Sequence, residues 1–123
     1  MKRKISCLIV MVFLVLLIPT PAQAKLNKRD GVNYYKGTKE TYYNLPMDRI
    51  FAKADANFGK HHKKWVDERG VWRYGPYVVL AVPFDVYPYG TTDIPTSLGP
   101  GIALDTGAFA EVNKNQVDVA VTW

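Results

Sequence analysis

The stretch GIALDTGAFAEVNKNQVDVAVTW, residues 101–123, predicts two strands separated by an Asp-Thr-Gly turn. In its last seven residues, valines alternate with Asp118 and other small or polar residues, a period of two that is typical of a half-buried strand. In the first strand, Ile102 and Leu104 lie on one face and Asp105 on the other. We therefore expect both aspartates to leave their strands away from the apolar residues. If the strands are neighbours, the two carboxylates can meet at a cleft.

The preceding part of the chain adds one helix and further short strands. An amphipathic helix is predicted over about residues 46–58, because its apolar side chains recur at helical spacing and Gly59 follows. Residues 65–74 indicate a hairpin with a glycine turn, and the apolar run 77–82 predicts the most buried strand. Residues 90–97 indicate an irregular strand. The pattern predicts a mainly β fold, a small six-stranded barrel with one helix.

The N-terminus has the features of a secretory signal peptide. Three basic residues precede an apolar run, and Ala22-Gln23-Ala24 forms a cleavage site, so we expect residues 1–24 to be removed. The alternative is an uncleaved anchor. The only cysteine, Cys7, lies in this segment, so the secreted chain would lack disulfides, which is more typical of a bacterium. Residues 25–39 are interpreted as a flexible basic lead-in and residues 40–123 as the folded domain.

The charges are unevenly distributed. The whole chain has a formal charge of +5, but residues 25–73 hold 12 basic and 6 acidic residues, and residues 74–123 hold 1 and 5. This asymmetry suggests one half that faces anionic wall polymers and an acidic half that holds a cleft, although ordinary solvated surfaces would give the same pattern. Export and the acidic half argue against nucleic-acid binding.

Two separated segments resemble a known family. Asp105-Thr106-Gly107, followed by an apolar residue, Asp118 and valine, resembles the end of the 3D (three-aspartate) domain, and VYPYGT at residues 86–91 is similar to an upstream segment of that family. The resemblance covers about residues 77–123. It implies a double-psi β-barrel of secreted bacterial cell-wall proteins, related to the membrane-bound lytic transglycosylase A family. The family's first aspartate would fall on Pro83.

The resemblance also implies a reaction and its residues. One aspartate, Asp118 here, acts as acid and then base in cleaving a peptidoglycan glycan strand, and Asp105 is its partner. No metal or cofactor is needed. The remaining expected site residues bind substrate or shape the turn: Thr106, Gly107, Asp85, Tyr87 and Tyr89. Asp85 and Asp93 are the candidates for the third carboxylate. We expect a secreted, wall-associated monomer with no membrane span after cleavage of the signal.

Three other interpretations of these residues were weighed. A non-catalytic, expansin-like module that binds wall polymers remains open, with Trp72 and Trp123 as further exposed aromatics. The Asp-Thr-Gly turn also occurs in aspartic proteases, but only 16 residues follow Gly107, too few to complete such a barrel. The adjacent residues His61 and His62 could be zinc ligands, but adjacent side chains on an extended chain point apart, and the sequence shows no pattern that indicates a third ligand.

Overall fold

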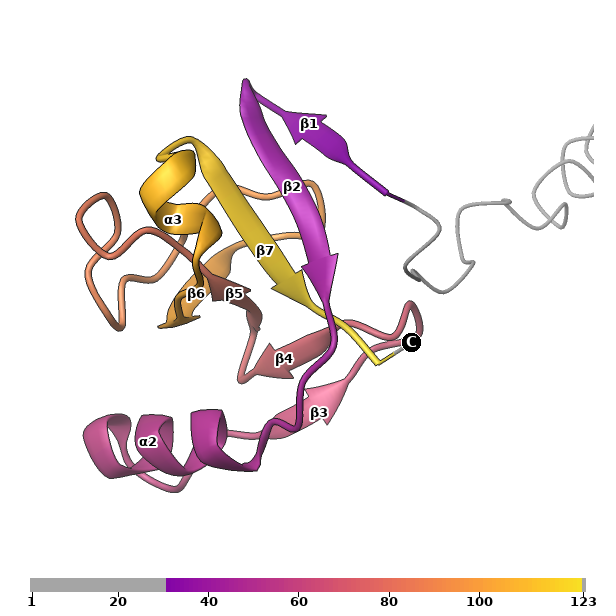
Figure 1. The fold of residues 1–123 in the computed structure, drawn as a ribbon. Helices are drawn as coiled ribbons and strands as arrows, with labels where there is room; N and C mark the ends of the chain where they lie inside the picture. Colours follow the sequence, from indigo (N-terminus) through magenta and orange to yellow (C-terminus); the bar gives the residue numbers. More distant parts are fainter. Residues whose placement is uncertain (1–30, 123) are drawn as a thin grey trace, which may run out of the picture.

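The computed structural model describes residues 31–122, and within them the chain forms a mixed seven-stranded sheet with two short helices (Figure 1). The expected signal peptide with Cys7, the start of the expected lead-in and Trp123 lie outside the described residues. The elements, in chain order, are β1 (Asn33–Tyr35), β2 (Thr38–Tyr43), α2 (Asp48–Phe58), β3 (Lys64–Val66), β4 (Trp72–Tyr74), β5 (Tyr77–Ala81), β6 (Gly101–Asp105), α3 (Phe109–Val112) and β7 (Gln116–Ala120). No helix among these is long and apolar enough to cross a membrane.

Strand β5 lies at the centre of the sheet. It pairs in parallel with β6 along one edge, and along the other edge it pairs in antiparallel fashion with β4 and then β7. Beyond β7 the order continues through β2 to β1. Four of the five β5 residues are buried, as expected for this apolar run, but four of the five β6 residues are buried as well, so β5 is not the most buried strand by itself.

Both faces of the sheet carry an apolar core, which is why the central strands are apolar throughout. One core gathers alternate residues of β5 and β7 with the loop before β6: Val71, Val78, Leu80, Val82, Ile94, Ala103, Val117, Val119 and Val121. The second core lies under α2: Met47, Ala54, Tyr74, Val79, Ile102, Leu104 and Ala120. The aspartates of interest emerge at the margin of this second core.

The prediction of a mainly β fold with an amphipathic helix is confirmed, but the closed barrel is wrong. In the described chain the sheet ends at β1 and β3, which have three residues each and one neighbour each. The outer edge of β6 is paired by an irregular segment, because Gly90 and Ile94 donate to Ala103 and Gly101. Only Ile94 there forms a β-bridge, so the strand expected at residues 90–97 is a loop, and Pro95 limits further pairing.

Two other elements differ from the expectation. The sheet begins inside the expected lead-in, because Lys36 and Gly37 have φ values of 49° and 83° and form a two-residue turn that pairs β1 with β2. Helix α2 begins at Asp48 rather than residue 46 and ends at Phe58, and Gly59 follows as its C-cap with a φ of 94°. The short helix α3, within the decisive stretch, was not predicted.

Candidate functional site

Asp105 and Asp118 are brought together by the register of three adjacent strands. Ala81 of β5 is paired with Asp105 of β6 on one side and with Asp118 of β7 on the other. Thr41 of β2 continues the row, since it is paired with Asp118. Neighbouring strands are about 4.8 Å apart, so the two aspartate Cα atoms lie roughly 10 Å apart. The methyl group of Ala81 leaves the space between the carboxylates open.

A bulge in β6 places Asp105 in this row. The pairing proceeds from Leu80–Ala103 to Ala81–Asp105, so Leu104 has no partner and the register shifts by one residue. Without the shift, the alternation of a regular strand would turn Asp105 to the face of Ala103, inside the first core. The bulge therefore converts a carboxylate that would be buried into one that faces the same side as Asp118.

Both carboxylates line one pocket of about 260 Å³ between β2, β6, β7 and the start of α3. The two aspartates contribute its acidic groups, and the Asp-Thr-Gly turn forms one wall. Its lining is Tyr43, Asn44, Leu45, Ala81, Asp105, Thr106, Gly107, Ala108, Phe109 and Asp118. The two aspartates share this pocket although β6 and β7 are not the neighbouring strands that the expected cleft required, because β5 lies between them.

Asp118 is half-buried in this pocket. Burial raises its pKa, the neighbouring Asp105 raises it further, and the hydroxyl of Thr41 lowers it by donating a hydrogen bond. That bond joins Thr41 Oγ1 to Asp118 Oδ1 at 2.9 Å, and Gln116 Nε2 donates to the same hydroxyl at 3.1 Å. These two hydrogen bonds hold Oδ1 of Asp118 in place, whereas Oδ2 makes no hydrogen bond within the described chain. A carboxyl group held in this way is suited to donating a proton into the pocket.

Tyr43 places a phenol beside both acids. Its hydroxyl oxygen is buried and has no hydrogen-bond partner in the described part of the chain. Burial raises its pKa far above the usual value, followed by the charges of Asp105 and then Asp118. Asp105 approaches this hydroxyl, but not in hydrogen-bond geometry. The phenol is therefore a neutral donor with no acceptor in the described chain, a state it shares with the hydroxyl of Tyr89, and buried polar groups in this state are uncommon in native proteins.

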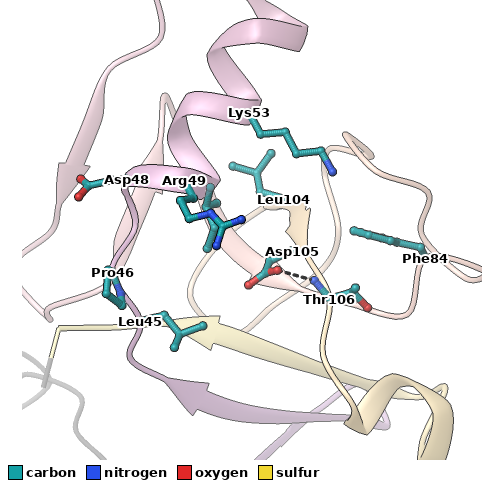
Figure 2. Close-up of a pocket in the computed structure, with 10 residues that line it drawn as sticks. Leu45, Pro46, Asp48, Arg49, Lys53, Phe84, Leu104, Asp105 and Thr106 are labelled. Carbon is teal, nitrogen blue, oxygen red and sulfur yellow. Dashed lines mark hydrogen bonds between the residues drawn. The ribbon is translucent and has the colours of Figure 1, made fainter.

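The turn after β6 is held by Asp105 itself. Its Oδ1 accepts a hydrogen bond of 2.9 Å from the backbone N–H of Thr106, drawn as the dashed line in Figure 2. Asp105 thus serves the turn as well as the pocket. Gly107 does not have a positive φ, so the backbone of the turn does not require glycine at this position. A side chain there would instead press on the ring of Phe109, at 3.3 Å.

A larger cleft of about 810 Å³ adjoins the pocket, and the two share Leu45, Asp105 and Thr106. Helix α2 forms one side of it, and β6 with the loop after β5 forms the other (Figure 2). Its remaining lining is Pro46, Asp48, Arg49, Ile50, Lys53, Phe84 and Leu104. The site therefore extends from the two acids toward two cationic side chains of α2.

The other predicted site residues do not line either cavity. Asp85 is exposed and forms an ion pair of 3.0 Å with Lys114, which lowers the pKa of Asp85. Asp93 is also exposed. Neither supplies a third carboxylate to the pocket.

The aromatic residues expected to be exposed are half-buried instead. Tyr87 packs against the first core, and Trp72 and Tyr89 pack against the second. Tyr89 acts on the cleft indirectly, because the Nζ of Lys53 lies 4.4 Å from its ring centroid.

The expectation that the adjacent histidine side chains point apart is wrong, because the ring centroids of His61 and His62 lie 4.0 Å apart; His61 is exposed and His62 half-buried. His62 Nε2 lies 3.2 Å from the carbonyl oxygen of Phe58, and its ring lies 4.8 Å from that of Tyr74. Across residues 31–122, no group of three or more His, Cys, Asp or Glu side chains is placed to hold a metal ion.

Sequence reasoning missed Thr41, Tyr43, Arg49 and Lys53 as residues of the site. The alternation of β2 was the available signal for the first two, since Thr41 and Tyr43 share a face, but it requires knowing that β2 lies beside β7. Comparison with known proteins adds no further assignment: no family model, curated protein or solved structure matches this chain.

Proposed function

We propose that the protein is a secreted bacterial cell-wall protein that cleaves the glycan strands of peptidoglycan, with Asp118 as the acid and then the base. One observation carries the proposal: Asp118 has a raised pKa and shares a pocket with Asp105. Breaking a glycosidic bond requires a carboxyl group that keeps its proton, and burial beside a second carboxylate favours the protonated form. The sequence resemblance to the three-aspartate domain supplies the substrate class.

The proposed steps follow from the free oxygen of Asp118. The carboxyl group gives its proton to the glycosidic oxygen, and the bond from that oxygen to the anomeric carbon breaks. The C6 hydroxyl oxygen of the same sugar bonds to the anomeric carbon and returns its proton to the Asp118 carboxylate. The product has a 1,6-anhydro ring, and no water is consumed. The Asp105 carboxylate would stabilise positive charge that develops on the sugar ring.

Digestion of purified peptidoglycan by the mature protein and by Asp118→Asn tests this proposal. We expect soluble products with 1,6-anhydro ends, identified by mass spectrometry, and their loss in the variant. Asp85→Asn is the matched control, because Asp85 is exposed and outside both cavities. Ordinary reducing ends that depend on Asp118 would mean hydrolysis at the same site. No products, with both proteins pelleting with the wall, would make the protein a binding module and reject catalysis.

A further inference from the structure

The larger cleft carries two cationic side chains that form no ion pair within residues 31–122. Arg49 and Lys53 lie one turn apart on α2 and line the cleft, and neither forms an ion pair with another described residue. In Figure 2, Arg49 extends toward Asp105, whereas Asp48 points away from it. Asp48 also lines the cleft, but its carboxylate is turned away from the region between Arg49 and Asp105.

Lys53 is held in place by an aromatic group. Its ammonium lies 4.4 Å from the ring centroid of Tyr89. That ring is stacked on Phe58 with a centroid distance of 5.6 Å and meets Phe84 edge-on at 6.1 Å. The contact restricts a flexible side chain, so less entropy is lost when the ammonium binds an anion.

The walls of the cleft suit a sugar that bears such an anion. Leu45, Ile50 and Phe84 supply apolar surface, and the cavity of about 810 Å³ is large enough for several sugar-sized units. A guanidinium presents paired N–H donors that match the two oxygens of a carboxylate, and the ammonium adds a second positive charge.

From these features we infer that the cleft binds a carboxylate of the glycan, or of a peptide attached to it, between Arg49 and Lys53. This inference rests on the proposed function for the glycan itself. The cation pair would anchor the strand by its negative charge and so bring a neighbouring glycosidic bond over Asp105 and Asp118. Arg49 and Lys53 are in this account positioning residues that set which strands are accepted, and they take no part in the proton transfer.

The test compares binding of matched glycans by calorimetry at low ionic strength, with Asp118→Asn used to prevent cleavage. The probes are a tetrasaccharide of N-acetylglucosamine and N-acetylmuramic acid with free carboxylates, its carboxamide, and a peptide-bearing tetrasaccharide with free or amidated carboxylates. We expect the free acids to bind more tightly. Arg49→Gln and Lys53→Gln should each weaken that binding by about threefold to fivefold, as for exposed ion pairs. The matched control, Lys60→Gln, removes an exposed lysine outside the cleft and should leave binding unchanged.

The outcomes separate this inference from the proposed reaction. A preference for the free sugar acid, or only for the free peptide acid, identifies the source of the carboxylate and supports the site. Equal binding of acid and amide, no binding of any probe, or the same loss in Lys60→Gln would overturn it. If the native protein produces anhydro ends from acid and amide equally well, the reaction stands and the carboxylate site fails. If the acid is preferred but nothing is cleaved, the site stands and the reaction fails.

Discussion

Replacing Tyr43 by phenylalanine should stabilise the protein. The hydroxyl of Tyr43 is buried without a hydrogen-bond partner in the described chain, beside two carboxylates. A buried hydroxyl without a partner costs about 1–3 kcal/mol, and its removal leaves the ring in place. We therefore expect Tyr43→Phe to raise the free energy of unfolding by about 1 kcal/mol or more. For a domain of this size that corresponds to an increase in Tm of about 4–8 °C per kcal/mol.

Tyr74 offers a matched control with the opposite sign. Its hydroxyl is also enclosed, but it donates to Asp55 at 3.1 Å, and burial followed by this bond raises the pKa of Tyr74 to about 12. Tyr74→Phe deletes the same atom and loses a hydrogen bond, so it should destabilise the fold by about 0.5–1.5 kcal/mol.

Thermal and urea unfolding of the native protein and the two variants measure both effects. If Tyr43→Phe destabilises the protein as much as Tyr74→Phe does, the Tyr43 hydroxyl has a partner and the reasoning is refuted. Under the proposed function, the stabilised Tyr43→Phe protein should also cleave glycan more slowly, because a donor beside the acids is lost.

Three further predictions follow from the packing and the charges. Gly101→Ala should lower the free energy of unfolding, measured in urea, by about 1–3 kcal/mol, because a methyl group there collides with the buried side chain of Leu80. Gly107→Ala should lower it by less, and equal losses of stability in the two variants would contradict this prediction. Thr41→Val removes the hydrogen bond that lowers the pKa of Asp118, so the alkaline limb of the pH–rate profile should move to higher pH, and an unchanged profile would count against Asp118 as the acid. Asp118→Asn should be more stable than the native protein at neutral pH, and the difference should vanish below about pH 3.8. The pKa of Asp118 is raised by folding, so the free energy of unfolding of the native protein falls as the pH rises from 3.8 through the folded pKa. A difference between the two proteins that does not change with pH would refute this prediction.

The local patterns of the chain predicted much of the sheet. The apolar run of β5 and the alternation of β7 were sufficient to predict both strands, because a strand that is buried on both faces is apolar throughout and one that is buried on one face alternates. The hairpin of β3 and β4 was marked by Gly70, whose φ is 81°. Helix α2 was marked by its apolar spacing.

The closure of the sheet and the exact composition of the site were not predictable in the same way. The residue pattern of a strand does not indicate whether the outer edge of that strand pairs with another strand or with an irregular segment. The outer edge of β6 pairs with an irregular segment. The position of Asp105 depends on a bulge at Leu104, and the same alternation without the bulge turns the carboxylate inward. The pairing of β2 with β7 joins residues about 77 positions apart, so Thr41 and Tyr43 carry no local sign of their neighbours.

The central claim is that Asp105 and Asp118 form one site in which burial and the neighbouring carboxylate raise the pKa of Asp118, and a carboxyl ¹³C NMR titration tests it most directly. We predict that Asp118 titrates above 3.8 in the native protein and that Asp105→Asn lowers its midpoint, because the neighbouring charge is removed. Asp85, whose pKa is lowered by Lys114, serves as the internal reference and should not move. A midpoint for Asp118 at or below 3.8, or one that is indifferent to Asp105→Asn, would contradict the shared site.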